Sequence, residues 1–292
     1  MQQTFELFSM TFNLGTGAIF LLVLLALIAG RYASNRIILS LITLTVLVGL
    51  SIDLLNLSAV PCVLILCLSA YYFKYNQDKK LTFFNGCVIF ISSVLILLHL
   101  VPGFNNPILI DNFPVSENAP QYTKYLNIDK ALLGVLLLAF VVPQAKSFSL
   151  KKGLVVLGVV SVCLVLSFGL GLYSGLISYD PKISSILLGW MITNLFFTCF
   201  VEEAFFRGFV QQRIQQLSAK TYWQYVSILL SGVLFGLAHF PGGQTYTIIA
   251  SIMGVAYAFS YYKTKNIYVS ISVHFIFNLL HFSLFTYPFN LT

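Results

Sequence analysis

Apolar residues run through the sequence in long stretches that are separated by short polar connections. Each stretch is about 20 residues long, the length that a helix needs to cross the ~30 Å hydrocarbon core of a bilayer. Since backbone groups inside lipid must be hydrogen-bonded and the stretches lack the alternation of barrel strands, the predicted fold class is all-α. We predict ten membrane-spanning helices, at residues 11–30, 37–55, 57–73, 82–101, 130–144, 153–176, 184–204, 223–240, 244–262 and 267–286.

The basic residues predict the orientation of these helices. All but three of the 16 lysines and arginines fall in alternate connections, and the exceptions are Lys124, Lys130 and Lys182. The positive-inside rule therefore places both termini outside and the basic connections in the cytoplasm. With 58% hydrophobic and 9% charged residues the chain cannot form a water-soluble globule, so we expect the lipid bilayer to surround it. The net charge of +7 is explained by this orientation signal and implies no nucleic-acid partner.

The chain divides at its polar connections into three predicted regions. Residues 1–129 form an N-terminal transmembrane region with no chemistry to assign, residues 130–183 add further transmembrane helices, and residues 184–292 form the predicted catalytic core. The N-terminus lacks a cationic leader and a cleavage site, so we expect the first span to be retained. The five cysteines are all within spans and lack CxxC spacing, which predicts reduced packing residues.

In the second half of the chain, ionisable residues interrupt the apolar helices, where they are costly and mark functional sites. The sequence Glu202-Glu203-Ala-Phe-Phe-Arg207 directly follows an apolar run. Glu203 and Arg207 are four residues apart and are expected to pair, whereas Glu202 points about 100° away. We expect this helix to continue to about Gln216, which would place Glu202 well inside the bilayer.

A second cluster contains Phe235 and His239, four residues apart. The small residues Gly232, Gly236 and Ala238 would let a neighbouring helix approach closely. This histidine is therefore expected to face protein.

A third cluster places His274, Asn278 and His281 on one face of the last predicted helix. Taken singly, each cluster also has a structural explanation, as an interfacial salt bridge or a hydrogen bond between helices. Three clusters on neighbouring helices favour a functional site. His99, alone in an apolar span, is expected to be structural.

Amide hydrolysis inside a membrane requires groups of these kinds. A desolvated carboxylate has a raised pKa and acts as a general base for water, which is a role that suits Glu202. His239 can share the water and shuttle the proton. His274 and Asn278 can donate hydrogen bonds to the oxyanion, each worth about 3–4 kcal/mol.

The motifs EExxxR, FxxxH and HxxxN, in this order on successive helices, resemble the CAAX-processing and bacteriocin-processing (CPBP, Abi or Rce1-like) family of intramembrane proteases. The resemblance covers about residues 184–286. It implies an intramembrane endopeptidase with Glu202 as the catalytic glutamate, Glu203 and Arg207 as its supporting partners, His239 holding the water, and His274 with Asn278 stabilising the oxyanion.

The chemistry of this family has been interpreted with and without a metal. A zinc site needs three good ligands and a water, which Glu202, His239 and His274 can supply. The sequence has no HExxH motif, however, and Asn278 stands where a helix-borne zinc site would favour a histidine or a carboxylate. We therefore expect a metal-free mechanism without a cofactor, with a zinc protease as the alternative.

Two other classes of protein fit the sequence less well than a protease. A proton-coupled transporter would show internal repeats with matching helix breaks, and the sequence shows none. A non-catalytic immunity or scaffold protein would tolerate the loss of a motif residue, and all are present. The expected partner is a peptide or membrane-protein substrate of unassigned identity, and the oligomeric state is open. The short connections favour a bacterial cytoplasmic membrane.

Overall fold

The computed structural model describes residues 4–30 and 32–291, and the chain is mostly helical (69%). The helical segments in the first half are α1 (Leu14–Ala29), α2 (Asn35–Ser51), η1 (Leu57–Ala59), α3 (Val60–Tyr75), α4 (Lys79–Leu97), α5 (Ile128–Leu136) and η2 (Leu137–Val141). Those in the second half are α6 (Leu150–Tyr173), α7 (Leu187–Asn194), η3 (Leu195–Cys199), α8 (Phe200–Glu203), η4 (Ala204–Gln211), α9 (Gln212–Gln216), α10 (Tyr222–Ala238), η5 (Phe240–Gly242), α11 (Gln244–Thr264) and α12 (Ile267–Leu284).

Each predicted span coincides with helix in the structure, with ends that differ by a few residues. The helix that begins at Leu187 continues through short segments to Gln216, as expected. Within the described residues, four helical stretches are long and apolar enough to cross a membrane: Leu57–Tyr75, Lys79–Leu97, Leu150–Tyr173 and Ile267–Leu284. The structure thus supports a helical membrane protein, while the number of spans and the side of the termini remain predictions.

The ends of several helices are set by polar side chains that cap the first backbone N–H groups. Asn13 accepts a hydrogen bond from the Thr16 N–H, and Asp78 accepts from the N–H groups of Lys80 and Leu81. Ser34 and Asn266 cap α2 and α12 in the same way. Such caps satisfy donors that have no partner inside the helix, and so they fix where each helix begins.

The chain forms two compact units, each built from separate stretches of sequence. Unit 1 comprises Met1–Asp111, Thr123–Val142 and Leu188–Phe205, and unit 2 comprises Asn112–Tyr122, Pro143–Leu187 and Phe206–Thr292.

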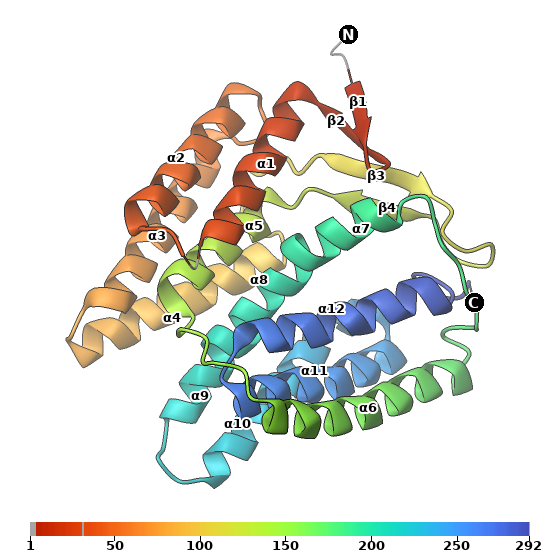
Figure 1. Cartoon of the computed structure of the whole chain (residues 1–292). Helices are drawn as coiled ribbons and strands as arrows, with labels where there is room; N and C mark the ends of the chain where they lie inside the picture. Colours follow the sequence, from red (N-terminus) through yellow and green to blue (C-terminus); the bar gives the residue numbers. More distant parts are fainter. Residues whose placement is uncertain (1–3, 31, 292) are drawn as a thin grey trace. The chain divides into compact units, whose positions relative to one another are not determined.

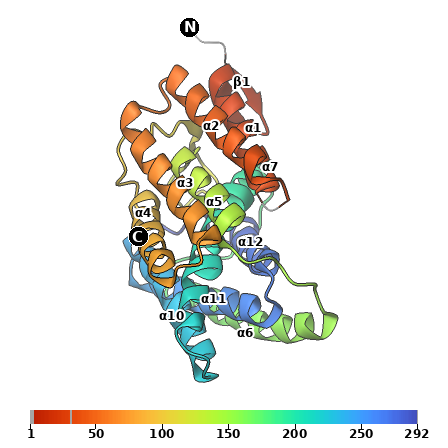
Figure 2. The ribbon, with the colours of Figure 1, turned by 90° about the vertical axis from the view of Figure 1, so that its left-hand side faces the viewer.

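The core of unit 1 is α5, which packs against α1, α3 and α4 (Figure 2) and also against α8. Nearly all of its side chains are buried, in keeping with a helix that is apolar on most sides. Gly134 permits the closest approach, because a Cβ there would lie 2.8 Å from Val201 Cγ2 and 3.2 Å from Leu27 Cδ2. The helix that carries Glu202 is therefore seated directly on the core of this unit.

Two short β-ribbons depart from the all-α prediction. β1 (Thr4–Leu7) pairs antiparallel with β2 (Met10–Asn13), and β3 (Ile108–Phe113) pairs with β4 (Tyr122–Tyr125). The second ribbon lies in the polar connection between the predicted spans 82–101 and 130–144. Its two strands are hydrogen-bonded to each other, so their backbone groups have partners without forming a helix.

The core of unit 2 is α11, which packs against α6, α10 and α12 (Figure 1). The predicted small-residue face of α10 is confirmed at Gly232 and Gly236. A Cβ at Gly232 would lie 2.7 Å from the Val255 backbone nitrogen, and one at Gly236 would lie 2.7 Å from Thr247 O. The two backbones therefore approach closely. In contrast, α6 exposes most of its apolar side chains, as a lipid-facing helix would.

Candidate active site

The predicted glutamates lie in unit 1, on the short segment α8. Glu203 is fully buried and Glu202 is partly exposed. Because α8 packs on the buried helix α5, the backbone at both glutamates is held by the core of the unit. The pairing of Glu203 with Arg207 remains a prediction.

The segments on either side of α8 are π-helical. Inside the first of them, η3, Cys199 Sγ lies 3.3 Å from Asn194 Oδ1, to which it donates a hydrogen bond. The second, η4, begins immediately after Glu203. Single π-turns inside α-helices occur often at functional sites. The glutamate pair is thus placed on a helix whose winding changes both before and after it.

Arg207 is fully buried in unit 2. Its Nη2 donates a hydrogen bond of 3.0 Å to Gly254 O, and its Cζ lies 4.5 Å from the ring centre of Phe235 and 5.2 Å from that of Tyr257. A buried guanidinium is stabilised by such hydrogen bonds and by the faces of aromatic rings. Arg207 therefore joins its own helix to α10 and α11.

Two glutamines extend this attachment along α11. Gln211 Nε2 donates to Ala258 O at 2.9 Å, and Gln212 Nε2 donates to the Tyr261 hydroxyl at 2.6 Å. The partners advance in the same direction along both segments, which shows that the two run parallel.

His239 lies at the end of α10, and a backbone carbonyl fixes its ring. Nδ1 is 2.7 Å from Phe235 O, and the ring centres of Phe235 and His239 are 4.6 Å apart. Because a carbonyl only accepts hydrogen bonds, Nδ1 must carry the proton. In the neutral imidazole the lone pair is then on Nε2, which suits this nitrogen to accept a proton from water or to bind a metal ion.

His274 is buried, and two aromatic rings hold it in place. Its ring stacks on Tyr257, with centres 4.5 Å apart and planes at 16°, and meets Phe235 edge to face at 5.4 Å. Asn278, one turn further along α12, is partly exposed. His281 contacts Tyr287 with ring centres 5.3 Å apart, and we assign it to packing at the end of the helix.

Unit 2 thus brings together Arg207, Phe235, His239 and His274, which are linked through their contacts with Phe235. Tyr257 completes this group, and no motif in the sequence singles it out. It lies between two alanines on an apolar helix, a pattern that indicates packing and carries no chemical signature. The predicted approach of Glu202 to the histidines remains a prediction.

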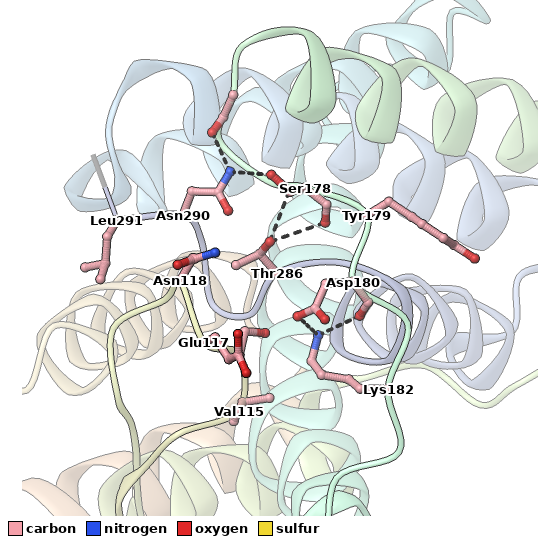
Figure 3. Close-up of a pocket in the computed structure, with 12 residues that line it drawn as sticks. Val115, Glu117, Asn118, Ser178, Tyr179, Asp180, Lys182, Thr286, Asn290 and Leu291 are labelled. Carbon is pink, nitrogen blue, oxygen red and sulfur yellow. Dashed lines mark hydrogen bonds and ion pairs between the residues drawn. The ribbon is translucent and has the colours of Figure 1, made fainter.

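Unit 2 also contains a polar pocket of about 650 Å³ beyond the end of α12 (Figure 3). Lys182 Nζ donates hydrogen bonds to Asp180 Oδ2, Asp180 O and Phe285 O, which occupies all three of its N–H groups. Asn290 Nδ2 donates to Ser178 Oγ at 3.0 Å. These bonds tie the C-terminal segment to the connection after α6, and none of the predicted site residues lines the pocket. We therefore interpret the pocket as structural.

The structure and the sequence comparison together support a helical membrane protein, part of which is similar to a protease family. Residues 184–280 match the family model described as type II CAAX prenyl endopeptidase, Rce1-like. This match confirms, over residues 184–280, the resemblance predicted from the three motifs, and the matched family is a protease family. No curated protein and no solved structure matched the chain.

Proposed function

We propose that this protein is an intramembrane endopeptidase that cleaves a peptide bond with a water activated by Glu202 and His239. The observation that carries the proposal is that the family match, residues 184–280, contains all four predicted catalytic residues, Glu202, His239, His274 and Asn278. The proposal also requires the two units to bring Glu202 and His239 to the same water.

In the proposed reaction Glu202 accepts a proton from water, and the resulting hydroxide attacks the carbonyl carbon of the substrate. The lone pair on His239 Nε2 lets this ring accept a hydrogen bond from the same water. His274 and Asn278 donate hydrogen bonds to the oxyanion. When the C–N bond breaks, the proton passes to the leaving nitrogen, and the products are a carboxylic acid and an amine.

The second candidate is a zinc-dependent protease that uses Glu202, His239 and His274 as ligands. The hydrogen bond from His239 Nδ1 to Phe235 O favours it, because metal-binding histidines are commonly held by a carbonyl in this way. In the described part of unit 2 no third His, Cys, Asp or Glu is grouped with the two histidines, so Glu202 would have to complete the site. A bound zinc ion would lower the pKa of its water and polarise the substrate carbonyl.

The proposed substrate is a peptide or the tail of a membrane-associated protein. The matched family is named for the cleavage of prenylated CAAX proteins, but the short connections of this chain favour a bacterial cytoplasmic membrane, where other peptides would serve. We propose that the protein lies in a lipid bilayer.

The test is reconstitution of the purified protein in liposomes with a library of quenched fluorogenic peptides. Wild type, Glu202→Ala and His239→Ala are compared with and without a strong chelator. We expect cleavage that both substitutions abolish and the chelator leaves intact. Cleavage that the chelator abolishes and zinc restores would establish the second candidate, and equal activity in all three proteins would reject the site.

A further inference from the structure

Lys124, on strand β4, reaches the helix that carries Glu202. Its Nζ donates a hydrogen bond of 3.1 Å to Thr198 Oγ1. Thr198 lies in η3, four residues before Glu202. All three residues belong to unit 1, but Lys124 lies outside the segment that matches the protease family, residues 184–280. A residue from the N-terminal part of the chain is thus attached next to the proposed catalytic glutamate.

Among the charges that act on Lys124, the negative charge of Glu202 favours the ammonium most. Burial lowers the pKa of Lys124 to about 8, the negative charge of Glu202 opposes this change, and the nearby positive charge of Lys130 adds to it. Cys199 contributes a smaller effect in the same direction as Glu202. At neutral pH the ammonium is therefore still protonated, and a nearby negative charge stabilises a partly buried cation of this kind.

The backbone that carries Lys124 is itself fixed by a polar cluster at the start of α5. His99 Nδ1 and Asp129 Oδ2 are 2.7 Å apart, and Asn106 Nδ2 donates to Asp129 Oδ1 at 3.1 Å. Asn106 Oδ1 accepts a hydrogen bond of 2.8 Å from the Ile128 N–H. His99 therefore does not lie alone in an apolar span. It lies beyond the end of α4 and, as expected, has a structural role, which is to hold the connection between β4 and α5.

We propose that Lys124 is a positioning residue for the catalytic glutamate, and that its ammonium, anchored on Thr198, holds the Glu202 carboxylate in its reactive orientation. This inference rests on the proposed function. A general base must be ionised and must point at its water, and a fixed cation on one side of the carboxylate favours both conditions. The N-terminal region, for which the sequence indicates no chemistry, then contributes directly to the active site.

The test compares Lys124→Met, Lys124→Arg and Thr198→Val with wild type in the liposome peptide assay. We expect Lys124→Met to lower kcat about 10- to 100-fold with KM changed less than about threefold, because the substrate does not touch this residue. Lys124→Arg keeps the positive charge and is expected to recover part of the loss. Thr198→Val removes only the anchor and is expected to lower kcat by a smaller factor, about 3- to 10-fold.

Lys79→Met is the matched control, because it removes an exposed lysine at the start of α4 and is expected to leave kcat unchanged. The inference is overturned if Lys124→Met retains wild-type kcat while Glu202→Ala is inactive, or if Lys124→Arg is no better than Lys124→Met. If Lys124→Met does not fold, a wild-type kcat in Thr198→Val overturns it instead. Full activity in Glu202→Ala would instead reject the proposed function itself.

Discussion

The two units hold their predicted site residues by different physical means. In unit 1 a charge acts on Glu202, because the partly buried ammonium of Lys124 is hydrogen-bonded to Thr198, one turn before Glu202 on the same helix. In unit 2 the imidazoles of His239 and His274 are held by aromatic rings and by a backbone carbonyl. We therefore expect charge to control the reactivity of the Glu202 carboxylate, and shape to control the orientation of the two imidazoles. Substitutions that change one property and keep the other can separate them.

The largest effect is expected from removing the charge of Glu202 while keeping its shape. Glu202→Gln should lower kcat/KM for peptide cleavage by about 10³-fold or more, since a neutral amide cannot act as a general base. The temperature of unfolding in detergent should change little. Glu117→Gln, at an exposed carboxylate of the polar pocket, is the matched control and should cleave normally. Activity within tenfold of wild type in Glu202→Gln would contradict the role of charge.

The second-largest loss of activity is expected from removing the ring of Tyr257 in unit 2. Tyr257→Leu removes the surface on which His274 stacks and should lower kcat/KM about 10- to 100-fold. Tyr257→Phe keeps the ring and should remain within a few-fold of wild type. If both variants lose activity equally, then the hydroxyl, and not the ring, is the important group.

A smaller effect is expected at the contact between α10 and α11. An alanine Cβ at position 236 would overlap Ser251 Oγ and Thr247 O, so Gly236→Ala should destabilise the protein by about 1–3 kcal/mol. Gly158→Ala on α6 is the control, because nothing lies within 4 Å of a Cβ there. Thermal unfolding in detergent should distinguish the two variants, and equal unfolding temperatures would show that the helices can move apart without cost.

The smallest effect is the contribution of Lys124 to the pH dependence of stability. Its pKa is about 8 in the folded protein and 10.5 in a model peptide, so between these values the unfolded chain binds more protons. Stability should therefore rise with pH in this window, by about 1 kcal/mol between pH 8 and pH 9. The difference between wild type and Lys124→Met should show this rise, whereas Lys79→Met should follow wild type. An unchanged difference across the window would mean that the ammonium is not buried.

The sequence predicted the helices well, because each apolar run must form helix in order to satisfy its backbone in lipid. It also predicted the continuation of the Glu202 helix to Gln216 and the small-residue contact of α10. The β3–β4 ribbon was missed because its strands lie in a polar connection without clear alternation. The π-turns around Glu202 were missed because a change in helix winding leaves no mark in hydrophobic periodicity.

The sequence likewise predicted some residues of the site and missed others. Phe235, His239 and His274 come together as their motifs indicated, because Phe235 and His274 lie on facing helices and His239 lies at the end of α10. Lys124 and Tyr257 could not be selected from the sequence. Lys124 reaches Thr198 across 74 residues of chain, and such a contact depends on how β4 is attached to α5. Tyr257 is part of the site only because its ring contacts His274 and Arg207.

The hydrogen bonds from Arg207 and Gln211 to α11 end on backbone oxygens of Gly254 and Ala258. Every residue type supplies such an oxygen, so a side-chain substitution on α11 leaves both acceptors in place. The alignment of the two segments is therefore protected from most mutations on one side and depends on the identity of two residues on the other. In evolution, side chains on α11 can therefore change while both acceptors remain, whereas changes at Arg207 and Gln211 would require a new way to align the helices.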